Sequence, residues 1–132
     1  MNKTNIMENK TIEQQRKEYL DAKVAYYSED VNRRATNSAG GCEYLTDDGR
    51  KCAIGLDMIE THPSYNNAIG CNNVNDLLEK YPNILPQEVK NLGVSFLFSI
   101  QNLHDGASYW NDSGLSISGE YIYNEIIREY CK

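Results

Sequence analysis

The chain has 132 residues, of which 40% are hydrophobic and 24% charged, and it carries a formal net charge of -6. This length suits one domain of common size, and we expect a single domain over residues 11–132 after a disordered N-terminal segment, residues 1–10. No apolar stretch approaches the ~20 residues that span a bilayer, and the N-terminus lacks the apolar core of a secretory signal. We therefore expect a cytoplasmic protein with no membrane partner.

The balance of charges bears on the class of partner. Lys and Arg number 13 against 19 Asp and Glu. A protein that binds duplex nucleic acid normally presents a basic stripe, because neutralised phosphates supply most of its non-specific affinity. The composition thus argues against duplex binding. It leaves open a local basic pocket for a small anion, and also an acidic surface that docks on a basic partner.

A helix is predicted to begin at Thr11, because Thr11 and Gln14 have the spacing of a capping box. Apolar residues recur at helical spacing after this cap. The helix is expected to end near Arg33 or Arg34, since residues 37–41 have the composition of a loop.

A β-hairpin is predicted over residues 42–55. Asp48-Gly49 separates two short arms of alternating pattern, and glycine supplies the positive φ of such a turn at low steric cost. The alternation places Cys42, Tyr44 and Thr46 on one face. Tyr44 then lies opposite Cys52 or Ala53.

Several helices are predicted after the hairpin. A short helix is expected to open over residues 56–60, a polar loop over 64–73, and short helices after Asn73 and Pro86. An apolar pattern predicts the core helix over 94–110, with Phe98 broadening its buried face. The last helix is expected from Ser116 or Ser118 to Tyr130, with Tyr121 on its apolar face. The predicted fold class is α+β: one small domain with an N-terminal helix, a β-hairpin and several helices packed around it.

Two motifs carry a resemblance. One is Cys-x-Tyr, a glycine turn and Cys-Ala-Ile-Gly; the other is Gln-x-x-His-Asp at a helix end, with a tryptophan shortly after. Over residues 37–110 the chain resembles a family of small proteins encoded by phages and their bacterial hosts. It departs from the family pattern at Asp57-Met58, where relatives have Ile-Pro-Asp. The matching residues are Cys42, Tyr44, Gly49, Cys52, Ala53, Gly55, Gln101, His104, Asp105 and Trp110.

The resemblance implies a phage setting, in which small proteins block or sequester parts of host defence. Together with the residue chemistry, it leads us to expect a non-enzymatic anti-defence protein that binds and sequesters a small nucleotide-derived immune signal. We expect it to act as a homo-oligomer in the host cytoplasm. The alternatives are an acidic inhibitor that binds a host defence protein and a small metal- or cysteine-dependent hydrolase.

The candidate ligand-binding residues lie around the predicted hairpin and at the end of the core helix. The cationic side chains suit phosphate oxygens, and Tyr or Trp gives a flat face on which a base can stack. We assign no cofactor, no catalytic residue and no metal ligand. The predicted ligand-binding set is Arg33, Arg34, Tyr44, Arg50, Lys51, His104, Asp105 and Trp110.

Two residue combinations could support the hydrolase alternative, and a third set of residues could form a structural zinc site. Cys52, His104 and Asp105 form a nucleophile, a base and an orienting group on paper. A second combination, His62, His104, Asp105 and Asp112, follows in order the letters of a metal phosphohydrolase pattern. A third set for zinc lacks the close Cys pair usual in structural sites. It consists of Cys42, Cys52, His62 and Cys71. Reduced, buried cysteines are the simpler interpretation of these residues and of Cys131.

Overall fold

The computed structural model describes residues 10–36 and 43–132. Most of the described chain is helical, and an N-terminal helix and a two-stranded antiparallel hairpin confirm the α+β fold class. Nearly all of the predicted disordered segment 1–10, and Cys42 of the predicted hairpin, lie outside the described residues. The elements are α2 (Ile12–Glu29), η1 (Val31–Arg33), η2 (Gly55–Asp57), α3 (Tyr65–Ala68), α4 (Val74–Lys80), α5 (Gln87–Lys90), α6 (Val94–Asp105), η3 (Ala107–Tyr109), β1 (Trp110–Asn111), β2 (Gly114–Leu115) and α7 (Ile117–Tyr130), where η marks a 3₁₀-helix.

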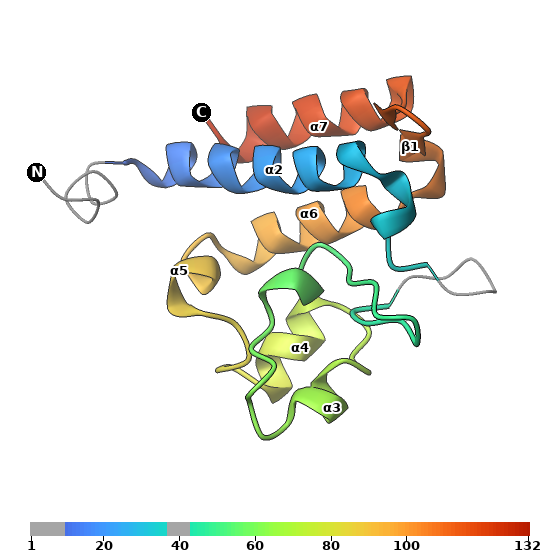
Figure 1. Ribbon diagram of the computed structural model, residues 1–132. Coiled ribbons are helices and arrows are strands. Elements are labelled where there is room, and N and C mark those ends of the chain that lie inside the picture. The colour runs from blue at the N-terminus through green and yellow to red at the C-terminus, as the bar shows by residue number, and fades with distance from the viewer. Residues whose placement is uncertain (1–9, 37–42) are drawn as a thin grey trace, which may run out of the picture.

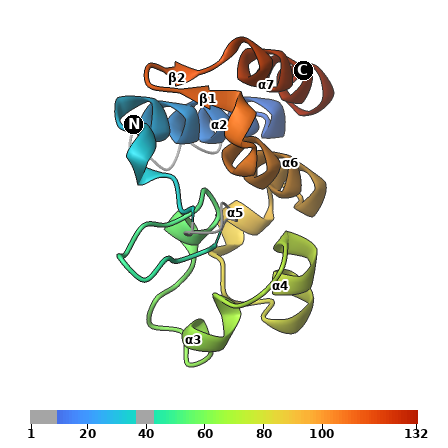
Figure 2. The same cartoon turned by 90° about the vertical axis from the view of Figure 1, so that its right-hand side faces the viewer.

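Three long helices form one side of the molecule. Figure 1 shows α7, α2 and α6 side by side, with α7 running opposite to the other two. The shorter helices α3, α4 and α5 and the irregular segment 43–64 lie below α6. Figure 2 shows the β1–β2 hairpin beside α7, on the side of the molecule away from α3. Within the described residues, no helix has both the length and the apolar character needed to cross a bilayer.

The first helix begins as predicted and ends earlier. The Thr11 hydroxyl accepts the Gln14 N–H at 3.1 Å, and the Gln14 side chain accepts the Thr11 N–H, which completes the capping box. Asp30 leaves the helical conformation, and its carboxylate accepts the Asn32 N–H at the start of η1. The predicted end near Arg33 or Arg34 is therefore wrong, because an aspartate that caps the next turn stops α2 at Glu29.

The predicted hairpin over 42–55 is present in part. Gly49 has a φ of 88° in the turn, and Leu45 pairs with Lys51 through one antiparallel bridge. The Cys52 N–H donates to the Tyr44 carbonyl, so these residues lie opposite each other as predicted. The arms do not extend into a ladder. Residues 53–57 instead turn into η2, where a predicted α-helix over 56–60 is replaced by one 3₁₀ turn.

Other boundaries follow local caps. Asn73 caps α4 as predicted, through a 2.8 Å hydrogen bond from the Asp76 N–H. The predicted loop over 64–73 contains the short helix α3. Ser116 caps α7, which runs to Tyr130 as expected.

The predicted core helix over 94–110 ends at Asp105. Gly106 follows it, and a Cβ there would meet the Tyr109 ring at 2.2 Å, so the chain folds back tightly into η3. Trp110 consequently lies on β1 and not on a helix. The β1–β2 hairpin was missed, although Gly114 in Asn111-Asp112-Ser113-Gly114, with a φ of 125°, is a turn signal.

The core is made by the facing sides of α2, α4 and α6. Leu20, Leu77, Phe96 and Leu97 are fully buried within it. Phe98 is 37% exposed, and so it does not broaden the buried face of α6 as predicted. Tyr121 is likewise exposed on α7, where Ile126 is buried.

Gly55 gives a test of the packing around the 43–55 segment. A Cβ on Gly55 would lie 2.2 Å from the Tyr44 carbonyl oxygen, which is backbone and has little room to move. We expect Gly55→Ala to lower the free energy of unfolding in urea by about 1–3 kcal/mol, as overpacked core sites do. Gly70→Ala is the matched control, since a Cβ there would meet only the Asn67 carbonyl oxygen, at an ordinary contact distance of 3.4 Å. Equal losses in the two variants would contradict this packing.

Candidate functional site

The end of α6 gathers most of the predicted ligand-binding residues. His104 and Asp105 form its last turn, and side chains from η1, the 43–52 segment and β1 converge on it. The last carbonyls of a helix have no partner within the helix and need donors from elsewhere. Arg34, Trp110 and the Gly106 N–H meet that need here.

Arg34 satisfies two of these carbonyls. Its Nε donates to the His104 carbonyl at 2.8 Å, and a terminal nitrogen donates to the Asp105 carbonyl at 3.2 Å. The guanidinium carbon also lies 6.0 Å from the Trp110 ring centroid. A cation at a helix C-terminus is favoured by the helix dipole. Arg34 is therefore held as a helix cap.

Trp110 supplies the next donor. Its indole N–H donates to the Leu103 carbonyl at 2.8 Å, and the Gly106 N–H donates to the Asn102 carbonyl. The indole ring packs edge-on against Tyr27, with 6.0 Å between centroids. Every main-chain carbonyl from residue 102 to 105 thus has a donor. The indole that was expected to stack on a base is used within the fold.

His104 is almost fully buried, at 1% exposure, and both ring nitrogens have partners. The Ala35 N–H donates to Nε2 at 3.2 Å, and Nδ1 lies 2.7 Å from the Asp105 carboxylate. Since Nε2 accepts, the neutral ring carries its proton on Nδ1 and donates it to Asp105. Burial lowers the pKa of His104 below its usual value, although the hydrogen bond to Asp105 and its charge act against this.

Arg50 joins the turn at Gly49 to the residues after η1. One terminal nitrogen donates to the Arg34 carbonyl at 2.9 Å, and the other donates to the Thr36 carbonyl at 2.7 Å. Its Nε contacts both oxygens of Asp48. A hydrogen bond from the Thr46 side chain lowers the pKa of the Asp48 carboxyl most, and the hydrogen bonds from Arg50 lower it further. Arg50 therefore connects the turn at Gly49 to the segment that follows η1.

The remaining predicted residues also contact the protein itself. Tyr44 is 2% exposed, and its hydroxyl donates to the Gln101 side chain at 3.3 Å. Lys51 pairs with Glu60, while its carbonyl accepts the Tyr27 hydroxyl at 2.6 Å. Arg33 lies at the surface, where it pairs with Glu29 and covers the Tyr26 ring.

A small cavity lies beside this cluster, between α2 and α6. Its wall includes Leu20, Lys23, Tyr27, His104 and Trp110, and its volume is about 10 Å³. This is close to the smallest space that holds one water molecule. A nucleotide does not fit in it.

The predicted metal-ligating sets do not come together in the part of the chain that the structure describes. Among residues 10–36 and 43–132, no three His, Cys, Asp or Glu side chains lie close enough to hold a metal ion. His104 uses both nitrogens as described, and the Cys52 thiol accepts the Gly55 N–H at 3.3 Å. The part of the zinc prediction that involves Cys42 lies outside the described residues.

The sequence did not point to Tyr27, which links the cluster together. Its ring packs edge-on against His104 at 4.8 Å, and it is 1% exposed. The only signal was its place in the apolar pattern of the first helix.

A second unpredicted network joins Tyr19 and Lys23 of α2 to Asp57, at 2.5 Å and 2.7 Å. Burial raises the pKa of Tyr19 well above its usual value.

Comparison with protein-family models, with curated proteins and with solved structures finds no match to this chain. The resemblance to small phage and prophage proteins therefore stays a prediction, and function is argued from geometry.

Removal of the Arg34 cap tests its role. We expect Arg34→Met to lower the free energy of unfolding by about 2–4 kcal/mol, because two buried carbonyls lose a charged donor. The matched variant is Arg33→Met, which removes an exposed ion pair and should cost less than about 1 kcal/mol. Chemical denaturation of both variants measures the difference, and a loss in Arg33→Met as large as that in Arg34→Met would count against the cap.

The buried His104 predicts a pH dependence of stability. The unfolded chain takes up a proton on this residue near pH ~6.5, whereas the folded chain does so only at lower pH. Stability from the neutral ring is thus complete above that pH, falls as the pH drops, and is lost below the folded pKa. We expect His104→Gln to be less stable at pH 7.5 but to lose less stability between pH 7.5 and 5. Parallel pH profiles of unfolding for the two proteins would contradict this.

Proposed function

We propose that the protein is a non-catalytic binding protein whose acidic surface docks on a basic surface of a partner protein. The observation that carries this proposal is how the chain uses its own cations. The formal net charge of -6 means that the protein as a whole attracts cations. The contacts within the chain determine which charged side chains remain available to a partner.

The basic side chains are used within the protein. Among the described residues, every Lys and Arg except the terminal Lys132 has a carboxylate or carbonyl partner. Arg16, for example, donates to the Leu92 and Tyr130 carbonyls and lies beside two aromatic rings, 5.7 Å from each centroid.

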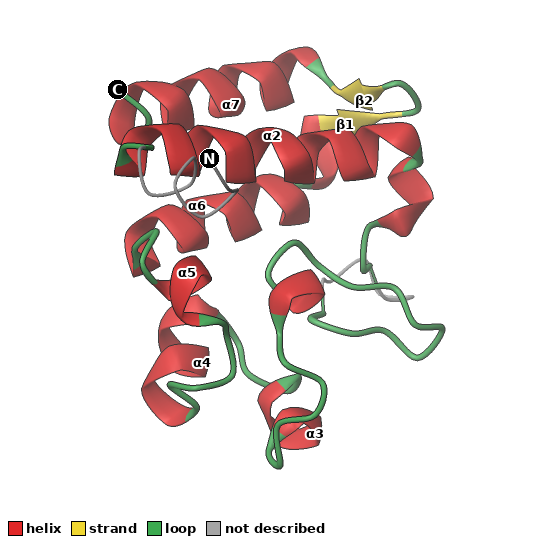
Figure 3. Cartoon of the chain, turned by 60° about the vertical axis from the view of Figure 1, so that its left-hand side comes forward, coloured by secondary structure: helices red, strands yellow, loops and turns green. Residues whose placement is uncertain are grey.

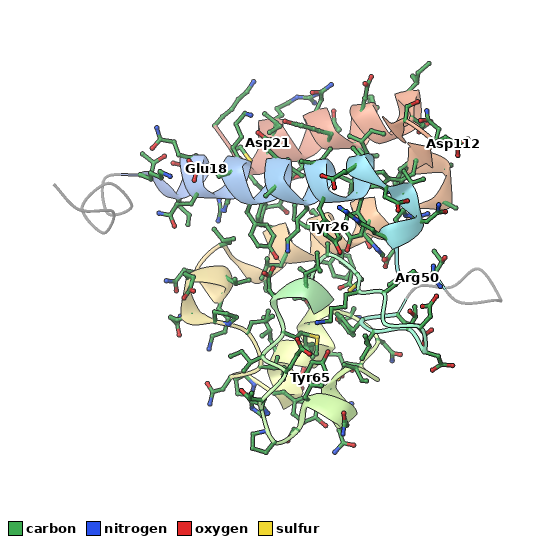
Figure 4. The ribbon with its side chains drawn as sticks, viewed as in Figure 1. Glu18, Asp21, Tyr26, Arg50, Tyr65 and Asp112 are labelled. Atoms are coloured by element: carbon green, nitrogen blue, oxygen red, sulfur yellow. The ribbon has the colours of Figure 1, made fainter. Side chains whose placement is uncertain are left out.

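Several exposed carboxylates have no such partner. They form no ion pair within residues 10–36 and 43–132, and they are spread over loops and helices. Asp112 projects from the turn between β1 and β2, whereas Glu18 and Asp21 on α2 have lysine partners (Figure 4). Those whose side chains also have no hydrogen bond among the described residues, which we call the unpaired carboxylates, are Glu43, Asp47, Glu79, Glu88, Asp112, Glu120 and Glu129.

The same contacts bear on the expected nucleotide ligand. A phosphate that used Arg34 or Arg50 would have to replace carbonyl acceptors already in place, and hydrogen bonds to charged groups contribute about 1.5–3 kcal/mol each. Tyr44 is too deeply buried to stack on a base. Sequestration of an immune signal thus stays a prediction, with less geometric support than a protein partner. The phage setting and the homo-oligomer stay predictions as well.

A charge-neutralised variant tests the proposal. The unpaired carboxylates are changed to the matching amides, and wild type and variant are immobilised as capture reagents for extract of the source cells. We expect a defined basic protein on the wild type at about 50 mM salt, with release at about 500 mM because exposed charges are screened. Quantitative mass spectrometry should show its loss from the variant.

A second measurement separates the ligand classes. Native mass spectrometry of the purified chain reports any bound small molecule and the subunit number. A nucleotide adduct without a captured protein would reject the proposal in favour of signal sequestration. Identical captured proteins on wild type and variant would reject the role of the carboxylates.

A further inference from the structure

The seam between α6 and α7 is hollowed on its solvent side. One hollow of about 220 Å³ is walled by Asn102 of α6, Tyr109 of η3, and Ile122, Glu125 and Glu129 of α7. A second hollow of about 250 Å³ shares Ser99 with the first and is walled by Phe98 and Tyr130. The two hollows therefore adjoin at Ser99, and together we call them the α6–α7 groove.

Exposed apolar side chains concentrate on these two helices. Val94 and Phe98 lie one turn apart on α6 and are 42% and 37% exposed. On α7, Ile117 and Tyr121 lie one turn apart and are 89% and 64% exposed. Of the described large hydrophobic residues that are exposed, Tyr26 alone lies elsewhere, and Arg33 covers its ring. Of these four side chains Phe98 lines a hollow, whereas the other three lie on the same two helices outside both hollows.

The charge of the groove is negative. Glu125 and Glu129 line it, and no Lys or Arg is among the described residues that line either hollow. Arg128 pairs with Glu125 at 2.5 Å, while Glu129 belongs to the unpaired carboxylates. A second copy of this chain would bring the same carboxylates against each other, which electrostatic repulsion opposes. The lining mixes apolar side chains, such as Phe98 and Ile122, with polar ones and carboxylates, and it complements a helix that carries both apolar side chains and cations.

We infer that the α6–α7 groove binds a basic amphipathic helix of the partner protein, with apolar side chains in the hollows and Lys or Arg beside Glu125 and Glu129. The inference rests on the proposed function and names its binding site. Helices in grooves are recognised through apolar anchors at i, i+3, i+4 and i+7. The 14 residues of α7 extend over about 21 Å, so the groove suits a helix of three to four turns.

A synthetic peptide serves as the probe. It has 14 residues, with leucine at i, i+3, i+4, i+7 and i+11 and lysine elsewhere; a second peptide replaces each lysine with glutamate. Each peptide is titrated into the full-length chain, labelled with ¹⁵N, and amide chemical shifts are recorded. We expect the lysine peptide to shift resonances of residues 94–105 and 117–130, and the glutamate peptide to shift none.

Two variants address the two parts of the site. Glu129→Lys reverses an exposed, unpaired charge, and Phe98→Ser removes an exposed apolar contact. We expect each to weaken binding of the lysine peptide about tenfold, as anchor substitutions do. Glu18→Lys is the matched control, because it makes the same charge reversal at an exposed position of α2 that lines neither hollow, and binding should change less than about twofold. Circular dichroism checks that each variant is folded.

Each outcome decides a separate point. Shifts centred on the 43–52 segment, or equal loss of binding in Glu18→Lys and Glu129→Lys, would overturn the groove while leaving the acidic binding function intact. Concentration-dependent shifts of residues 94–105 and 117–130 without peptide would assign the groove to a second copy instead. Absence of any shift, although the immobilised chain captures its basic protein, would reject the groove alone. Absence of both would reject the proposed function too.

Discussion

The satisfied carboxyl end of α6 is the interaction on which the arrangement of the fold depends. Residues 102–105 present carbonyls inside the protein, and an unpaired buried carbonyl costs about 1–3 kcal/mol. The donors come from Arg34, Trp110 and Gly106. Since Arg50 in turn holds the Arg34 carbonyl, this one helix end connects the segment after α2, the 43–52 segment and β1. The residues that looked most like a ligand pocket are the ones that hold these parts together.

Arg16 repeats the arrangement at the other end of the three long helices. It donates to the Leu92 carbonyl before α6 and to the Tyr130 carbonyl at the end of α7, and it lies beside the Phe96 and Tyr130 rings. Arginine suits both places because its planar group donates several hydrogen bonds while stacking on aromatic faces. With these cations engaged inside the molecule, the surface that remains is acidic. The contacts of these arginine side chains therefore bear both on the stability of the fold and on the proposed mode of binding.

Local signals in the sequence were sufficient for several elements and insufficient for the site. The Thr11 and Asn73 caps, the turn at Gly49 and the start of α7 depend on residues within a few positions, so the pattern predicted them correctly. The identity of Arg34 as a helix cap depends on a carbonyl 70 positions away, which no local pattern contains. A sequence shows that an arginine is present, but burial and partners decide whether it meets a ligand or a carbonyl. The outward position of Phe98 was missed for the same reason.

The packing of α2 against α7 has a consequence for biosynthesis. Arg16 contacts Tyr130 across 114 positions and Tyr123 contacts Asp21 across 102, so α2 leaves the ribosome long before its neighbour is made. Contacts between such distant parts of a chain slow folding, because a large loop must close first. Until translation reaches α7, one side of α2 has only solvent or a chaperone to cover it. Ribosomes stalled before residue 117 should therefore carry a nascent chain that proteases cut within α2.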